Sequence, residues 1–207
     1  RRGNRLQSAC QLSRQTPAIQ GNLVKIGGEH ENARGAAITM QGVYCDGTSV
    51  RLRRDLAGPR PAEGEVVLRV RAAGVCDTDI QLARGYMGFR GVLGHEFLGR
   101  TADGRRVTAE INNACHRCPT CLGGLPQHCP NRTVLGILNH DGAMAEFVSV
   151  PERNLHAVPD AIDDLHAVFI EPLAAAFRIA EQVALGPGTK VAVLGDGKLG
   201  LLCTWVL

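Results

Sequence analysis

The sequence is poor in aromatic side chains and contains no long hydrophobic run. Aromatic residues make up 4% of its 207 residues, which argues against a platform that stacks the bases of single-stranded nucleic acid. No apolar run reaches the ~18–20 residues that a helix needs to cross a bilayer, so we expect no membrane partner. The net charge is only +3 and 44% of the residues are hydrophobic. A chain of this kind can bury the core of one or two domains.

Eight cysteines are present, and half of them lie close together at Cys115, Cys118, Cys121 and Cys129. Cysteines separated by two residues seldom form disulfides, because such close neighbours cannot easily reach the required Cα separation. Four thiolates at this spacing can instead enclose one tetrahedral Zn²⁺ in a closed, structural site. The alternative is a reduced loop without metal. A nucleic-acid zinc ribbon is disfavoured, since its two cysteine pairs stand about a dozen or more residues apart.

A second candidate metal site is scattered along the chain, at Cys76, His95 and Glu171. A thiolate, an imidazole and a carboxylate form a three-ligand zinc shell with an open fourth position, which is typical of catalytic zinc. Each residue alone has an ordinary alternative. Cys76 would be a small buried hydrophobe, and Glu171 would be a carboxylate at the start of a helix.

A glycine pattern, Gly195-x-Gly197-x-x-Gly200, follows residues 190–194, which are apolar after Lys190, and precedes the apolar stretch 199–207. We expect a fully buried parallel strand before the glycines and a helix after them. In that context the pattern indicates a dinucleotide-binding loop. Its first glycine permits the turn, the second lets a pyrophosphate approach the backbone, and the third allows close packing of helix and strand. The alternative is an ordinary strand–helix turn.

Taken in order, these motifs resemble those of the zinc-dependent medium-chain alcohol and polyol dehydrogenases. The motifs are Gly-Val-Cys-Asp-Thr-Asp at 74–79, Gly-His-Glu at 94–96, the four cysteines at 115–129, Asp-Gly-Ala-Met-Ala-Glu-Phe at 141–147, Glu-Pro at 171–172 and the glycine loop at 195–200. The resemblance covers about residues 40–207, and implies an N-terminal fragment of such an enzyme.

The fold implied by the resemblance is α+β followed by α/β. A GroES-like catalytic domain of the β-barrel type is expected at residues 40–160, where many short strands and glycine turns are predicted. The first part of a Rossmann cofactor-binding domain is expected at residues 161–207.

The resemblance also implies an oxidoreductase that moves hydride between an alcohol, such as a secondary alcohol or a polyol, and NAD or NADP. Cys76, His95 and Glu171 would hold a catalytic zinc, and the four clustered cysteines would hold a structural zinc. Thr78 would relay the departing proton, its alternative being a turn or cap residue. Glu96 would act beside His95 or as a transient ligand. A glutamate as the third ligand points toward polyol, sugar or threonine dehydrogenases.

Local signals predict further elements. Asp163 and Asp164 are expected to cap a helix that includes Phe169. Pro172 should keep Glu171 out of the α region and start a second helix, which the glycines and proline at 186–188 would end.

Other residues have plainer expectations. Only four residues, 100–103, separate Gly99 from Gly104, where the family has a longer hairpin, so we expect part of a barrel strand to be missing and a sheet edge to be exposed. Lys198 is expected to be a solvated surface lysine, its alternative being a positive charge near the cofactor phosphate. No role is expected for the histidines at positions 116, 128, 140, 156 and 166.

Residues 1–39 show no sustained hydrophobic period and are expected to be disordered. Their basic start also permits an organelle transit peptide, and Met40 is an alternative start of the protein. Cys10, Cys45 and Cys203 have no obvious pairing, which fits a reducing compartment such as the cytoplasm.

Two other functions are considered beside the dehydrogenase. One is a non-catalytic zinc-binding interaction module, which would need neither the open three-ligand shell nor the glycine loop. The other is a zinc-free reductase on the same fold, which would lack Cys76, His95 and the four cysteines. For the dehydrogenase we expect a small alcohol or carbonyl substrate, no nucleic-acid partner, and a homo-oligomeric whole enzyme.

Overall fold

The computed structural model of the chain describes residues 39–207, so the expectations for residues 1–38 lie outside the described part. The largest sheet has five strands in the order β10–β6–β5–β3–β9. These are β3 at Glu65–Gly74, β5 at Glu96–Arg100, β6 at Arg106–Ala109, β9 at Phe147–Pro151 and β10 at Leu155–Ala157. Every pairing within this sheet is antiparallel.

The remaining strands form two smaller sheets. The three-stranded sheet has the order β2–β1–β4, with β1 at Thr39–Cys45, β2 at Val50–Ala57 and β4 at Gly91–Val92. The two-stranded sheet consists of β7 at Asn112–Asn113 and β8 at Thr133–Val134. Short 3₁₀ turns lie at Tyr86–Gly88, Pro126–His128 and Glu152–Asn154.

The core lies between the strands and one short helix, α1 at Asp77–Ala83. Leu68 of β3, Phe97 of β5 and Leu82 of α1 are fully buried. Each such side chain contributes roughly 1.5–3 kcal/mol when it leaves water. The helix and the strands that position the candidate ligands therefore share one hydrophobic cluster.

The short connection at residues 100–103 forms a tight hairpin between β5 and β6. Gly99 pairs with Val107 and Arg100 with Arg106, and the amide of Thr101 donates to the carbonyl of Arg105 at 3.0 Å. The expectation of an exposed sheet edge here is wrong, because β6 pairs with β5 on one side and β10 on the other. The shorter turn closes the hairpin and leaves no edge there.

Two helices follow the strands, α3 at Asp164–Ala167 and α4 at Ile170–Gln182. Asp163 caps α3 as expected, since its side chain accepts from the amides of Leu165 and His166. The helix is shorter than expected, because α3 ends at Ala167 and Phe169 is already the N-cap of α4. The expectation that Pro172 excludes Glu171 from the helix is wrong. In the first turn of α4 the missing N–H of proline has no intrahelical partner to lose, so Glu171 is helical.

The segment after α4 differs most from expectation. No strand forms at residues 190–194, and Leu194 is 98% exposed rather than buried. Within the described residues no neighbouring strand lies beside this segment, so its backbone has no sheet partner. The helix after the glycines is present as α5, at Lys198–Val206.

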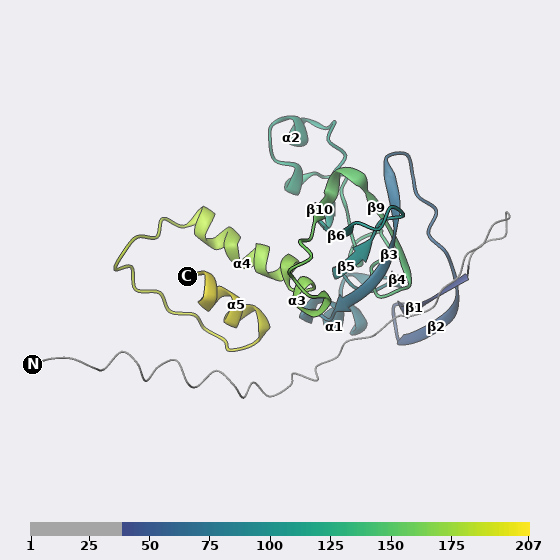
Figure 1. Cartoon of the computed structure of the whole chain (residues 1–207), viewed down its shortest axis with the longest axis horizontal. Helices are drawn as coiled ribbons and strands as arrows, with labels where there is room; N and C mark the ends of the chain where they lie inside the picture. Colours follow the sequence, from purple (N-terminus) through teal and green to yellow (C-terminus); the bar gives the residue numbers. More distant parts are fainter. Residues whose placement is uncertain (1–38) are drawn as a thin grey trace, which may run out of the picture.

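Helix α5 packs on α4 through Ala176, Leu202 and Cys203, which are buried together. Figure 1 shows these two helices side by side beyond the strands, while the lobe around α2, at Pro119–Leu122, projects separately. None of the helices within residues 39–207 has both the length and the apolar character for a bilayer span.

Gly94→Ala should lower the free energy of unfolding more than Gly64→Ala does. Both glycines have positive φ angles, +98° and +77°, so both substitutions add roughly 1–3 kcal/mol of backbone strain. At Gly94 an added Cβ would also lie 2.9 Å from the backbone nitrogen of Met144, whereas Gly64 has nothing within 4 Å. Urea denaturation of both variants checks this prediction, and equal losses would contradict it.

Candidate metal centres and glycine loop

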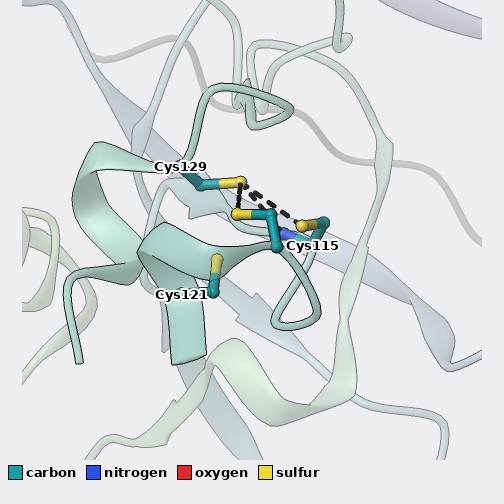
Figure 2. Close-up of side chains that lie close together, drawn as sticks. Cys115, Cys121 and Cys129 are labelled. Atoms are coloured by element: carbon teal, nitrogen blue, oxygen red, sulfur yellow. Dashed lines mark hydrogen bonds between the residues drawn. The ribbon is translucent and has the colours of Figure 1, made fainter. Parts of the chain in front are cut away.

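The four clustered cysteines form one compact group at the lobe. Their ligand atoms all lie within 4.8 Å of one another, and Figure 2 shows Cys115, Cys121 and Cys129 turned toward a common point. The sulfur of Cys129 is 3.5 Å from that of Cys115 and 3.8 Å from that of Cys118. A disulfide would need about 2.05 Å, whereas tetrahedral Zn²⁺ with bonds of about 2.3 Å spaces its sulfurs by about 3.8 Å. The geometry therefore fits zinc.

The pKa values of the lobe cysteines also favour a bound cation. Hydrogen bonding from the backbone of Arg117 lowers the pKa of Cys115 to about 6. Desolvation, together with Cys118 and Cys129, raises the pKa of Cys121 to about 12. Thiolates this close repel one another, so a bound cation is needed before all four can lose their protons.

Cys76, His95 and Glu96 form the second group, and their ligand atoms also lie within 4.8 Å of one another. The antiparallel pairing of β3 with β5 creates it, because Gly74 stands opposite Glu96 in the register. Cys76 follows two residues later as the N-cap of α1. A thiolate, an imidazole and a carboxylate at this spacing suit Zn²⁺, whose bonds to them measure about 2.0–2.3 Å.

Asp79 holds the backbone of this group in place, a role that its motif alone did not indicate. Its carboxylate accepts from the amide of Cys76 at 2.8 Å and from the amide of Gly94 at 3.1 Å. One of its oxygens is 3.6 Å from Nδ1 of His95, a buried atom with no hydrogen-bond partner. A carboxylate behind a histidine orients the ring and leaves Nε2 for a metal. The residue could have been found from the sequence, because it is the second aspartate of the 74–79 motif.

The proton affinities of Cys76 and His95 are linked. The hydrogen bond from His95 lowers the pKa of Cys76. Burial lowers the pKa of His95, but its contacts with Asp79 and Cys76 outweigh burial and raise that pKa to about 10. The pair thus favours a thiolate beside an imidazolium. Zn²⁺ would take the thiolate and a neutral imidazole, so metal binding would release a proton.

Two more predicted residues lie next to this group. The hydroxyl oxygen of Thr78 is 3.7 Å from the sulfur of Cys76. Glu171, in the first turn of α4, is half-buried, and burial raises its pKa while the charge of His95 opposes that rise. Its carboxylate lies outside the set within 4.8 Å. The carboxylate that the structure groups with Cys76 and His95 is therefore Glu96, and the ligand role of Glu171 stays a prediction.

Lys198 connects the glycine loop to the metal group. It is the first residue of α5, and its Nζ forms an ion pair with Oε1 of Glu96. The same Nζ lies 3.3 Å from the carbonyl oxygen of Val75. Only 31% of the lysine side chain and 2% of the glutamate side chain are exposed. The expectation of a solvated lysine is wrong, because Lys198 is paired with a buried carboxylate. The sequence did not indicate this contact, since the two residues are 102 positions apart.

The glycine loop has the features that a phosphate cradle needs. Gly195 adopts a φ of +113°, and a Cβ on Gly200 would lie 2.1 Å from the carbonyl oxygen of Gly195. Gly197 is the N-cap of α5 and has open space around it. A pyrophosphate could therefore approach the backbone at Gly197 and the N-terminus of the helix.

Comparison with known proteins agrees with this geometry. The family described as alcohol dehydrogenase GroES-like domain matches residues 62–160. An L-galactonate-5-dehydrogenase of Escherichia coli K12 is 30% identical over 176 residues, which are 79% of this chain and 51% of that protein. An L-threonine 3-dehydrogenase of Xanthomonas campestris pv. campestris is 30% identical over 164 residues, which are 72% of this chain and 48% of that protein.

A solved structure is similar as well. A zinc-binding dehydrogenase of Sinorhizobium meliloti, bound to NADP, superimposes with a TM-score of 0.73 at 32% identity, covering 80% of this chain and 52% of that one. The chain thus spans about half the length of the curated relatives it matches. The family and the GroES-like fold that the motif order predicts are confirmed. Residues 62–160 of the chain are therefore an alcohol dehydrogenase GroES-like domain, and most of the chain is similar to about half of the length of each of these dehydrogenases.

Proposed function

We propose that the chain is part of an enzyme that transfers hydride between an alcohol, such as a secondary alcohol or a polyol, and NAD or NADP. The observation that carries the proposal is the group of Cys76, His95 and nearby carboxylates beside the glycine loop. A purely structural zinc module would need only the four-cysteine lobe. The names of the relatives, which act on L-galactonate and L-threonine, support an alcohol substrate.

The domain boundaries are part of the proposal. Residues 40–160 would form the catalytic domain, and residues 161–207 would form the first part of the cofactor-binding domain. The change from strands to the helices α3, α4 and α5 after Ala157 supports this division.

In the proposed site the residues of the chain divide the work. Cys76, His95 and Glu171 would hold the catalytic zinc, which when bound polarises an alcohol oxygen and lowers its pKa. Asp79 would keep the imidazole of His95 in place. The hydroxyl of Thr78 would relay the departing proton, accepting it while passing its own proton on toward solvent, and its place 3.7 Å from the sulfur of Cys76 supports that role.

The cofactor would lie along the glycine loop. Gly195, Gly197 and Gly200 would hold its pyrophosphate at the N-terminus of α5, where the helix dipole favours negative charge. Near-attack positioning of the nicotinamide then decides the rate, since positioning supplies roughly 7–11 kcal/mol of a barrier.

We predict two zinc ions per chain, one in each group. Cys118→Ser should remove one zinc and unfold the lobe, because a structural zinc supplies on the order of 10 kcal/mol of folding free energy. Cys203→Ser, in the contact between α4 and α5 and in neither group, is the control and should keep both ions. Elemental analysis of the folded, metal-replete proteins measures the ratio. One zinc or none in the unaltered chain would contradict the prediction.

Cys76→Ser and His95→Ala should each reduce kcat for alcohol oxidation by far more than tenfold in the whole enzyme. Both residues would act on the substrate oxygen, whereas the glycine loop holds the cofactor, so the dissociation constant for NAD or NADP should change little. Steady-state kinetics and cofactor titration measure the two effects. A variant that kept more than about a tenth of kcat, a loss under ~1.4 kcal/mol, would exclude the catalytic role.

The 207-residue chain by itself should show no dehydrogenase turnover. Residues 190–194 form no strand, so the described residues 161–207 contribute no sheet of a cofactor-binding domain against which a nicotinamide could be positioned. The test is a steady-state assay of the zinc-loaded chain with NAD or NADP and a panel of alcohols and polyols. Turnover that exceeds the no-enzyme control and disappears in Cys76→Ser would refute this expectation.

A further inference from the structure

Two carboxylates compete for the proposed catalytic zinc. Glu171 occupies the predicted third-ligand position, yet Glu96 is the carboxylate within 4.8 Å of the Cys76 and His95 ligand atoms. If both carboxylates bound, a tetrahedral shell would be complete. A closed shell is structural and has no position for substrate. An open site therefore requires that one of the two carboxylates be restrained.

The structure shows what restrains Glu96. Its Oε1 forms the ion pair with Nζ of Lys198. Its Oε2 lies against Gly74, where an added Cβ would come within 2.7 Å of that oxygen. The carboxylate is 2% exposed, and an ion pair this poorly hydrated is screened far less by salt than a surface pair.

Charge at the site supports the same role for the lysine. A thiolate at Cys76 with the carboxylates of Glu96 and Glu171 carries more negative charge than Zn²⁺ can cancel. Lys198, the first residue of α5, pairs with the carboxylate of Glu96, so its positive charge offsets part of this excess negative charge.

We propose that Lys198 is a positioning residue that holds Glu96 away from the zinc and so keeps the fourth coordination position open. This inference rests on the proposed zinc site at Cys76. It predicts that loss of the lysine releases Glu96 into the coordination shell, and that metal binding becomes tighter as the site closes.

The test is zinc affinity of the 207-residue chain, measured by competition with a chromophoric chelator. Comparison with Cys76→Ser identifies the zinc that belongs to this site. Lys198→Met should tighten its binding about tenfold or more, within the range that partners of metal ligands control. Lys198→Arg keeps the charge and should bind zinc as the unaltered chain does. Lys190→Met is the matched control, since Lys190 is exposed in the segment before the glycine loop.

Coordination is tested separately with Co²⁺ in place of Zn²⁺. The visible absorption that disappears in Cys76→Ser belongs to this site, and its band positions depend on which donor fills the fourth position of the tetrahedral ion. Lys198→Met should shift those bands as the carboxylate of Glu96 replaces solvent there, and Glu96→Gln should abolish both the spectral change and the gain in affinity. Circular dichroism confirms that each variant is folded.

The outcomes separate the two proposals. Zinc binding that is the same in the unaltered chain and in Cys76→Ser would overturn the proposed function, and this inference with it. A zinc site at Cys76 whose affinity and cobalt spectrum do not respond to Lys198→Met would overturn only the role of Lys198. A response to Lys198→Met that persists in the Glu96→Gln background would also overturn it, because the lysine would then act through its charge alone.

Discussion

The pairing of β3 with β5 is the constraint on which the candidate catalytic site depends. It sets Gly74 opposite Glu96, and the chain then turns into α1 with Cys76 at its start. Residues 19 positions apart in the sequence thereby present a thiolate and an imidazole to each other. Asp79 fastens this arrangement, because one carboxylate binds both the amide of Cys76 and the amide of Gly94. A shift of the register by one residue would turn every side chain of β5 to the other face of the sheet.

The two metal groups differ in a way that matches the two roles of zinc. At the lobe four cysteine side chains face one another, so a metal there would be fully enclosed and would stabilise the fold. At Cys76 one thiolate, one imidazole and more than one carboxylate converge, and acidic and basic side chains from β5, α4 and α5 meet. Such a mixed and partly restrained set suits a metal that must accept a substrate oxygen.

Sequence spacing predicted the parts of the site that depend on local motifs. The four cysteines lie within 15 residues, and Cys76, His95 and Glu96 belong to two short motifs, so their identity was available without coordinates. The ion pair of Lys198 with Glu96 was not, because it joins residues 102 positions apart. The strand at 190–194 was predicted from its apolar residues alone. A strand also needs a partner, and the described residues supply none. The short turn at 100–103 was wrongly expected to expose a sheet edge, since β6 pairs with β10 as well as with β5.

X-ray absorption at the zinc edge tests most directly whether zinc binds at Cys76 and His95 as well as at the lobe, because it distinguishes sulfur ligands from nitrogen and oxygen ligands. For the zinc-loaded chain we expect zinc–sulfur distances of about 2.3 Å together with zinc–nitrogen or zinc–oxygen distances of about 2.0–2.1 Å. In Cys76→Ser the remaining zinc should be surrounded by sulfur alone. A spectrum of the unaltered chain with only sulfur ligands would contradict the account, as it would place zinc at the lobe and none at Cys76 and His95.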